Sequence, residues 1–341
     1  MNYKFSLNRS PIDERDFIYK SIVKLQELPI SYSRDSECSP IRDQGDYGFC
    51  YAFSGESMKE WQEWKEWSNV KPIFSPLFLA KHCKDIDGIP DSEGSYLRIA
   101  MKVLQDIGIC YESSYPYSGY TSFLKFPEVS TELFKQASKY KIKSYAICNS
   151  LEEVKNAVYN NGLVLGGILV CDNFLTPENG FVDNPEGNIL GGHAITIVGW
   201  DDNLQYKYKN GKTRKGFLKC RNSWSINYGN NGYFYLPYDY YNGKSDTFKY
   251  FFESWSSIDI VENIPEPVKE YWRVQVGNFS ILNNAINLRN KINSLDIPAI
   301  IKEKDEFYKV QVGCYTIKEN AYNKLNYMKS LGFQDAFVVY C

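Results

Sequence analysis

The stretch that decides the fold is Asp43-Gln44-Gly45-Asp46-Tyr47-Gly48-Phe49-Cys50-Tyr51-Ala52-Phe53-Ser54. It places a cysteine directly after a glycine-containing loop, and the residues from Tyr51 onward have the apolar spacing of a helix. The amino terminus of a helix carries partial positive charge, which favours the thiolate form of a cysteine over the thiol. Because the thiolate is the form that attacks a carbonyl carbon, the stretch predicts that Cys50 is a nucleophile.

A thiolate nucleophile needs a group that carries protons, and this chain has two histidines, His82 and His193. His193 follows Gly191 and Gly192 at the start of an apolar run that ends at Trp200, and the glycines let another segment approach closely. His82 lies in a helical stretch beside lysines. The sequence therefore predicts that His193 is the acid and base of the reaction.

Three further side chains complete the candidate site. Asn222 follows a strand predicted over residues 217–220 and is placed to accept a hydrogen bond from the second ring nitrogen of His193. Trp224 is expected to shield that contact from water, with ordinary core packing as the alternative. Gln44, six residues before Cys50, supplies an amide that donates to a developing oxyanion together with the backbone N–H of Cys50.

These segments resemble the papain-like cysteine peptidases. The family's nucleophile, histidine and asparagine signatures correspond here to residues 44–53, 192–200 and 221–233. His193 and Asn222 follow Cys50 by 143 and 172 residues, close to the separations typical of the family. The resemblance covers about residues 35–260. It implies a helical left subdomain, a β-rich right subdomain and an active site between them.

The chain departs from the family pattern at several positions. Tyr47 stands where the family has a disulfide-forming cysteine, and Ser225 replaces a glycine. No catalytic group is lost, but the pairing of the other eight cysteines stays open. Because 49 residues precede Cys50 in this sequence, too few for a folded propeptide, we expect no long prosegment of the kind that the family has. A short amino-terminal arm is left as the segment able to block the cleft.

The segment Asp91-Ser92-Glu93-Gly94-Ser95-Tyr96 resembles the glycine-rich strand that lines the substrate cleft of this family. The resemblance implies that Gly94 pairs with the substrate backbone and that Tyr96 helps to form a side-chain pocket. Ordinary turn and core roles fit these two residues equally well. Gly192 and Trp224 are the other residues that we expect to contact substrate.

A second feature is a repeat near the carboxyl end. Residues 273–280, Arg-Val-Gln-Val-Gly-Asn-Phe-Ser, recur as residues 309–316, Lys-Val-Gln-Val-Gly-Cys-Tyr-Thr, at an offset of 36. Each copy begins with an alternating strand pattern, continues with apolar residues at helical spacing and ends in a second apolar strand. Two such units predict a four-stranded sheet with two helices on one face.

This repeat resembles the sporulation-related repeat (SPOR) domain. The resemblance implies that the sheet face binds peptidoglycan, with a preference for glycan strands stripped of stem peptides. An open sheet would expose the candidate glycan contacts Gln275, Phe279, Gln311 and Tyr315. For the two aromatic residues, packing in the core is the alternative.

Composition limits the remaining choices. The 341 residues leave room for about two domains. The formal net charge of −2 argues against a protein that binds nucleic acid through bulk charge. The sequence contains no run of 18 apolar residues, so it predicts no membrane-spanning helix. The first twenty residues lack a secretory signal pattern, so we expect synthesis in the cytoplasm and action at the wall after lysis or nonclassical release.

The expected class is α+β: a papain-like two-subdomain fold, helical left and β-rich right, plus a small split-βαβ sandwich with a four-stranded sheet. The expected parts are an amino-terminal arm (1–34), a peptidase domain (35–262), a proline-containing linker (263–270) and a SPOR-like domain (271–341).

The expected function is a cysteine endopeptidase that needs no metal or cofactor, acts on a peptide or protein substrate, and is targeted to the bacterial cell wall. Two alternatives stay open: a peptidoglycan endopeptidase that cleaves stem-peptide crosslinks, and a non-catalytic wall-binding protein on a peptidase scaffold.

Overall fold

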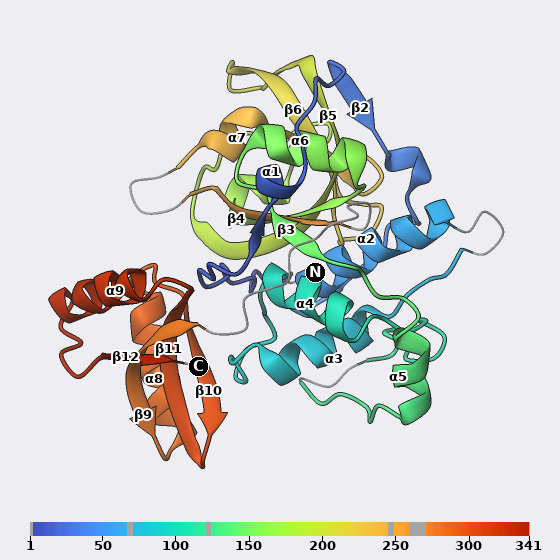
Figure 1. The fold of residues 1–341 in the computed structure, drawn as a ribbon. Helices are drawn as coiled ribbons and strands as arrows, with labels where there is room; N and C mark the ends of the chain where they lie inside the picture. Colours follow the sequence, from blue (N-terminus) through green and yellow to red (C-terminus); the bar gives the residue numbers. More distant parts are fainter. Residues whose placement is uncertain (1–2, 67–70, 121–123, 245–248, 259–270, 341) are drawn as a thin grey trace.

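The computed structural model describes residues 3–66, 71–120, 124–244, 249–258 and 271–340. Residues up to 258 form a larger domain with a helical half and a sheet half, and residues 271–340 form a smaller C-terminal domain beside it (Figure 1). This α+β architecture agrees with the class expected from the sequence. The predicted linker over 263–270 lies outside the described residues.

The helical half is built around one long buried helix. Helix α2 packs against its neighbours through Phe53, Met58, Leu79 and Leu104, which share one core. Ser75 caps the next helix, because its Oγ accepts a hydrogen bond from the backbone N–H of Phe78 at 3.0 Å. The helices of this half are α2 (Cys50–Glu66), α3 (Pro76–Ile86), α4 (Leu97–Asp106) and α5 (Thr131–Ala137).

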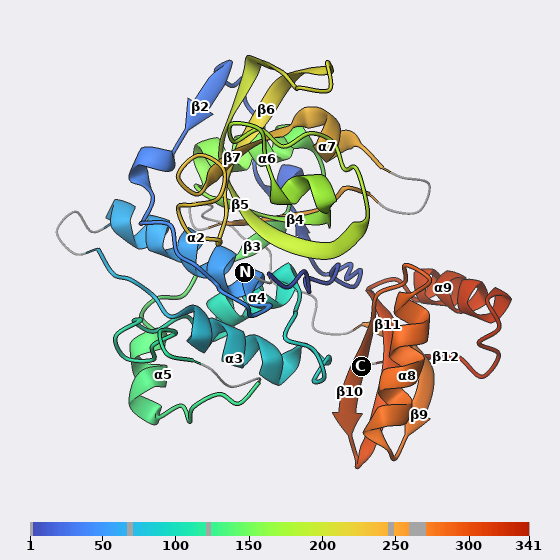
Figure 2. The ribbon, with the colours of Figure 1, turned by 180° about the vertical axis from the view of Figure 1, so that it is seen from behind.

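The sheet half is an eight-stranded sheet in the order β1-β3-β8-β4-β5-β6-β7, with β2 paired to β5. Its strands are β1 (Phe17–Ile18), β2 (Ser31–Ser33), β3 (Tyr145–Ile147), β4 (Val164–Cys171), β5 (Ile189–Lys207), β6 (Thr213–Arg221), β7 (Tyr233–Pro237) and β8 (Phe251–Ser257). Helices α1 (Tyr19–Ile22), α6 (Leu151–Asn160) and α7 (Tyr238–Asn242) belong to the same half (Figure 2). The long strand β5 pairs first with β4 and then with β6, so it runs through the centre of the sheet.

The C-terminal domain has the predicted repeat architecture. Its first unit is β9 (Trp272–Phe279), α8 (Leu282–Asn293) and β10 (Ala299–Lys304), and its second is β11 (Phe307–Tyr315), α9 (Lys318–Ser330) and β12 (Phe337–Tyr340). The antiparallel sheet has the order β10-β11-β9-β12. Val274, Val276, Val310 and Val312 point toward the two helices and form a separate core with Ile292. The two repeated strands β9 and β11 therefore lie side by side at the centre of the sheet.

Residues 3–16, here called the arm, connect all of these parts. The arm passes between the helical half and the sheet half (Figure 1). It then reaches the C-terminal domain, where the backbones of Asp13 and Cys314 form an isolated parallel β-bridge. The backbone N–H of Glu14 donates to the carbonyl of Cys314 at 2.9 Å. Among the described residues, no helix is both long and apolar enough to cross a membrane.

Candidate active site

Cys50 is the first residue of α2 and is fully buried. The carbonyl of Phe49, the residue before it, accepts the backbone N–H groups of Ala52 and Phe53 at 2.8 and 3.1 Å, which closes the first turn of the helix. Burial raises the pKa of the Cys50 thiol to about 12, although the backbone N–H groups of Ala194, Tyr51 and Cys50 face the sulfur and act in the opposite direction. Burial of Cys50 therefore favours the thiol over the thiolate.

His193 lies on β5, opposite Ile168 of β4. Its Nε2 is 2.8 Å from Oδ1 of Asn222, which follows β6. An amide oxygen can only accept, so Nε2 carries the proton and Nδ1 is left with a lone pair. Burial lowers the pKa of His193 to about 4, while the hydrogen bond to Asn222 raises it. The ring is neutral, and its Nδ1 has no hydrogen-bond partner among the described residues.

Trp224 covers the contact between His193 and Asn222. Its ring lies 4.6 Å from that of His193 and is 1% exposed. Phe174 and Tyr228 pack on it at 5.5 and 5.0 Å. The placement agrees with the predicted shielding role. The contacts that shield His193 are the same contacts that pack Trp224 into the core.

Gln44 is fully buried beside the same group of residues. Its Oε1 accepts a hydrogen bond from Ser223 Oγ at 2.6 Å, and its Nε2 donates to the carbonyl of Tyr47 at 2.8 Å. The backbone N–H of Gln44 also donates to the carbonyl of Ser223. An amide group has two N–H bonds, so one remains for a ligand. Cys50, His193, Asn222 and Gln44, which the sequence singled out from four separate segments, are thus brought together at the junction of the two halves.

The arm occupies the cleft above these residues. The backbone N–H of Leu7 donates to the carbonyl of Gly192 at 3.0 Å, and that of Asn8 donates to the carbonyl of Ser95 at 2.9 Å. A Cβ atom on Gly94 would lie only 1.7 Å from the carbonyl oxygen of Ser6. The two predicted substrate-binding glycines, Gly94 and Gly192, are therefore the positions at which a peptide backbone lies against the cleft.

Aromatic side chains of the arm close the site further. Tyr3 stacks on Trp224 with ring centroids 4.3 Å apart, and Phe5 meets the edge of the same ring at 5.7 Å. Phe5 also lies 6.3 Å from the His193 ring. These contacts contribute to the burial that keeps His193 and Cys50 neutral. The sequence raised the arm as a segment able to block the cleft, and the structure places it there.

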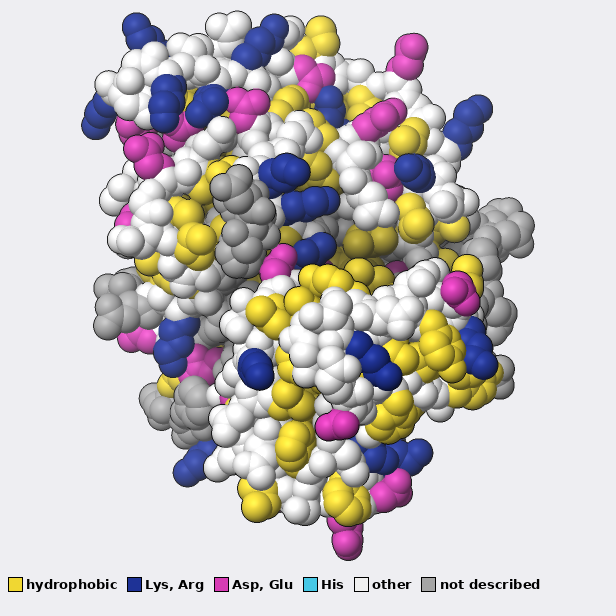
Figure 3. All heavy atoms as spheres, turned by 90° about the vertical axis from the view of Figure 1, so that its left-hand side faces the viewer, with side chains coloured by type: hydrophobic (Ala, Val, Ile, Leu, Met, Phe, Trp, Pro, Cys, Tyr) yellow, Lys and Arg dark blue, Asp and Glu magenta, His cyan; other side chains and the backbone are white. Residues whose placement is uncertain are grey.

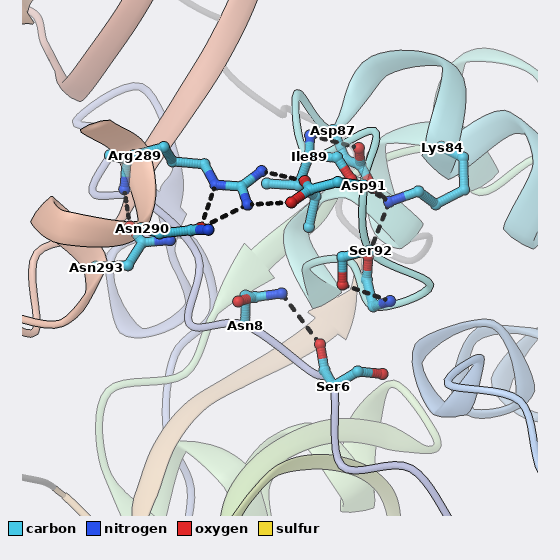
Figure 4. A network of polar contacts seen from close by, with 12 residues as sticks. Ser6, Asn8, Lys84, Asp87, Ile89, Asp91, Ser92, Arg289, Asn290 and Asn293 are labelled. Atoms are coloured by element: carbon cyan, nitrogen blue, oxygen red, sulfur yellow. Dashed lines mark hydrogen bonds and ion pairs between the residues drawn. The ribbon is translucent and has the colours of Figure 1, made fainter. Parts of the chain in front are cut away.

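Residues 87–95, here called the cleft loop, form the opposite wall. The ammonium group of Lys84 donates to Asp87 Oδ2, to the carbonyl of Ile89 and to the carbonyl of Gly94, at 2.7, 2.9 and 2.9 Å (Figure 4). Asp91 forms a two-bond ion pair with Arg289 of α8, at 2.7 and 2.9 Å (Figure 4). The loop is therefore held from both domains.

Glu93, in the cleft loop, is a residue whose role the sequence did not indicate. Its carboxylate accepts hydrogen bonds from Lys4 of the arm and from the backbone N–H of Gly48. The signal available in the sequence was an acidic residue beside the glycine predicted to line the cleft. Nothing in the pattern distinguished it from Asp91, which faces the other domain.

Tyr96 lies away from the catalytic residues. It is 1% exposed, and it lines a cavity of about 830 Å³ between the arm, α4 and the C-terminal domain, together with Arg98, Tyr271 and Arg273. The predicted pocket role of Tyr96 remains untested. His82, in the helical stretch expected for it, is also buried, with Nδ1 3.1 Å from Asp85 Oδ2 and its ring against Phe78.

The C-terminal sheet is less open than the sequence predicted. Gln275, Gln311 and Tyr315 are only 7%, 5% and 6% exposed, and Gln311 Nε2 donates to Gln275 Oε1 at 3.3 Å. Phe279 packs against the helix-side core. The expectation of exposure was wrong for Gln275, Gln311 and Tyr315, which are buried, whereas Phe279 is half-buried. Their predicted contact with glycan is not tested by this burial.

Hydrophobic side chains are exposed elsewhere on this domain. Figure 3 shows hydrophobic side chains scattered over its surface, in the lower part of the view. Nine large hydrophobic residues there are at least one third exposed: Ile281, Leu295, Phe307, Ile317, Tyr322, Tyr327, Leu331, Phe337 and Tyr340. Tyr340 lies 4.6 Å from Trp272, ring to ring. An aromatic surface of this kind suits stacking on sugar rings or apolar partners.

The cysteines of the described chain are all free thiols, namely Cys38, Cys50, Cys83, Cys110, Cys148, Cys171, Cys220 and Cys314. Cys341 lies outside the described residues. The described residues also contain no group of three or more His, Cys, Asp or Glu side chains arranged to hold a metal ion.

Comparison with known proteins places this site in a family. Residues 30–247 match the papain family cysteine proteases. The chain belongs to this family. Residues 268–340 match the SPOR domain, so the C-terminal domain is a SPOR domain. The chain is therefore a cysteine peptidase with a second module, as the sequence predicted.

Relatives and solved structures agree with this assignment. An uncharacterised peptidase-like protein of Acanthamoeba polyphaga mimivirus is 26% identical over 275 residues, covering 74% of this chain and 78% of that protein. The gut-specific cysteine proteinase of Caenorhabditis elegans is 24% identical, covering 65% and 70%. The fold is similar to that of xylellain, a cysteine protease from Xylella fastidiosa, with a TM-score of 0.62, 24% identity, and coverage of 75% of this chain and 97% of that one.

Proposed function

We propose that the chain is a cysteine endopeptidase in which Cys50 is the nucleophile, and that its SPOR domain targets it to peptidoglycan. The observation that carries the proposal is the joint placement of Cys50 at the start of α2 and of the His193–Asn222 hydrogen bond, 2.8 Å long, at the junction of the two halves. The free lone pair on Nδ1 of His193 gives the thiol a base.

The reaction follows from these positions. Nδ1 of His193 takes the thiol proton, and Cys50 Sγ attacks the scissile carbonyl carbon to give a tetrahedral oxyanion. The free N–H of Gln44 and the backbone N–H of Cys50 stabilise that oxyanion, and one such donor contributes roughly 100- to 1000-fold to the rate. His193 then protonates the leaving amine, and a thioester remains on Cys50. Water, with His193 as base, hydrolyses the thioester and restores the thiol.

The leaving amine must lie beside His193, which protonates it. The acyl part of the substrate then lies on the other side of Cys50, along Gly94 and the cleft loop. The arm runs in the opposite sense, because Tyr3 and Phe5 lie at Trp224 whereas Asn8 lies at Ser95. A segment bound backwards presents no carbonyl in the reactive orientation, so we infer that the arm is an inhibitor and not a substrate.

The SPOR domain supplies the targeting half of the proposal. Peptidoglycan is its expected partner, through the sheet that carries Gln275 and Gln311 or through the exposed aromatic surface. A wall-bound peptidase has two classes of substrate within reach, which are surface proteins and the stem-peptide crosslinks of the wall itself.

One experiment separates these classes. The wild-type chain and Cys50→Ala are incubated with casein and with purified sacculi, and released peptides and muropeptides are identified by mass spectrometry. Cleavage of casein by the wild type alone supports the peptidase, and released muropeptides would move the substrate to the wall crosslinks. A chain that cleaves neither substrate, even when the arm has been weakened by Tyr3→Ala, is not the proposed enzyme.

The targeting role is tested by sedimenting the chain with purified sacculi. Failure of the chain to pellet with sacculi contradicts the targeting role.

A further inference from the structure

Glu93 places a buried negative charge in the wall of the cleft. The residue is 3% exposed. Its Oε2 accepts the backbone N–H of Gly48 at 2.9 Å, and both carboxylate oxygens lie 3.0 Å from Nζ of Lys4. Within the described residues, Lys4 is the cation that neutralises this carboxylate. A buried carboxylate without a cation is costly, so the site requires a positive group.

The position of Glu93 relates this charge to the catalytic residues. Gly48, which donates to its carboxylate, comes two residues before Cys50. Tyr51, the residue after Cys50, donates its hydroxyl to the backbone carbonyl of Glu93 at 3.2 Å. Gly94, the next residue, lies against the peptide backbone of the arm. The carboxylate therefore lies beside Gly48 and next to Gly94, which we assign to the acyl side of Cys50.

The carboxylate is held there by contacts that do not involve the arm. Lys84 fixes the backbone of the cleft loop on both sides of Glu93 through the carbonyls of Ile89 and Gly94 (Figure 4). Arg289 fixes the same loop through Asp91. When the arm leaves the cleft, Lys4 leaves with it, but Glu93 keeps its position and its hydrogen bond from Gly48.

We propose that Glu93 selects substrates with a lysine or arginine at the residue that supplies the scissile carbonyl. The inference rests on the proposed function, because it names the substrate class of the same cleft. Lys4 of the arm occupies the place of that basic side chain. Lys4 is half exposed and only the Glu93 side of this ion pair is buried. A substrate with a basic side chain restores the ion pair that is lost when the arm leaves, whereas a neutral or acidic side chain leaves Glu93 without a cation.

The test compares two fluorogenic peptides that differ only at this residue. Each has the form acetyl-Ala-Ala-Xaa-aminocoumarin, in which Xaa is lysine or its uncharged analogue norleucine, and the full chain is assayed on both. We expect the ratio of kcat/KM for lysine over norleucine to be roughly 10- to 100-fold in the wild type. In Glu93→Gln, which keeps an acceptor for the N–H of Gly48, the ratio should fall to near one.

The arm cannot change the ratio of kcat/KM for lysine over norleucine. The fraction of molecules with an open cleft multiplies kcat/KM for both peptides equally. Lys4→Gln is therefore the matched control, because it weakens the arm and raises both rates but leaves Glu93 and the ratio intact. Asp46→Asn, which removes the same charge from the loop that carries Gln44, should also preserve the ratio.

The outcomes separate this inference from the proposed function. Cys50-dependent cleavage of both peptides at a ratio near one, or a ratio that survives Glu93→Gln, overturns the inference alone. Cleavage of neither peptide by the wild type, Lys4→Gln and Tyr3→Ala overturns the proposed function and the inference with it. If Glu93→Gln does not fold, the wild type alone is assayed on both substrates and with lysine and norleucine peptide aldehydes as inhibitors. A lysine aldehyde that inhibits no better than the norleucine aldehyde, or a substrate ratio near one, then overturns the inference.

Discussion

Oδ1 of Asn222 accepts two hydrogen bonds at 2.8 Å, one from Nε2 of His193 and one from the backbone N–H of Ser223. The second bond fixes the orientation of the amide, because the amide nitrogen could not accept from a backbone N–H. The oriented amide in turn fixes the ring of His193, so that Nδ1 is the nitrogen left for the thiol. In the proposed mechanism, the position of the asparagine thus determines which histidine nitrogen is the base.

Asn222→Ala should lower kcat/KM by roughly 100-fold, because a ring that is free to turn no longer keeps Nδ1 at the thiol. Asn227→Ala is the matched control, since Asn227 lies on the same loop but is exposed. Activity is measured on the norleucine or lysine peptide. A loss in Asn222→Ala equal to that in Asn227→Ala would contradict the orienting role.

The protonation state of Cys50 makes a second prediction. Burial raises the pKa of the thiol to about 12, so only a minute fraction is thiolate at neutral pH. Alkylation of Cys50 by iodoacetamide in the full chain should rise about tenfold for each pH unit between pH 6 and 9.5, without a plateau. The measurement is mass spectrometry of the peptide that contains Cys50.

Opening of the cleft should change the pH dependence of Cys50 alkylation. In Tyr3→Ala, water reaches the site more often, the pKa of Cys50 falls, and alkylation should be faster at neutral pH and level off at a lower pH. The buried thiol of Cys83, whose pKa is also raised by burial, serves as the internal reference in both chains. The idea fails if Cys50 of the wild type is alkylated at pH 7 as quickly as a free cysteine.

Much of this architecture was accessible from local sequence patterns. Ser150 and Glu153 have the spacing of a helix start, and in the structure Ser150 Oγ accepts the backbone N–H of Glu153 at 3.2 Å at the start of α6. Such caps are local, and they do not depend on the rest of the fold. The repeat of strands β9 and β11 is local in the same sense, because an alternating pattern and a glycine turn determine each unit.

The arm and Glu93 were less accessible, for a physical reason. Within the cleft the backbone of the arm lies against two glycines, through Leu7 on Gly192 and Ser6 on Gly94. Backbone contacts to glycines leave no periodic apolar signal in the sequence. The hydrogen bond between Gln275 and Gln311 joins strands of different repeats, and the repeat itself gave no sign that the two side chains would face each other.

Tyr3→Ala should raise the initial rate of the full chain by roughly tenfold, because the stacked pair with Trp224 and its buried area favour the closed cleft. The rate is measured on the norleucine peptide, which does not compete for Glu93. Tyr327→Ala, at an exposed tyrosine of α9, is the control and should leave the rate unaltered. Equal rates for the wild type and Tyr3→Ala would mean that the arm does not limit access.

The SPOR domain contacts the same arm, which leads to the last prediction. The carboxylate of Glu14 accepts hydrogen bonds from the backbone N–H and the hydroxyl of Thr316, at 3.0 and 3.1 Å, and from the amide of Asn320. These donors lie at the amino terminus of α9, where a negative charge is favoured. The anchored half of the arm therefore keeps residues 3–8 at a high effective concentration over the cleft.

Glu14→Ala should consequently raise the initial rate of the full chain by roughly 3- to 10-fold, although Glu14 lies outside the cleft. Glu319→Ala is the matched control, because it removes the same charge from the first turn of α9. Hydrogen exchange of the Leu7 and Asn8 amides, which are bonded to Gly192 and Ser95, should become faster in Glu14→Ala and stay slow in Glu319→Ala. Unchanged exchange in Glu14→Ala would refute the link between the two domains, and faster exchange with an unchanged rate would contradict the predicted effect of the arm on access to the nucleophile.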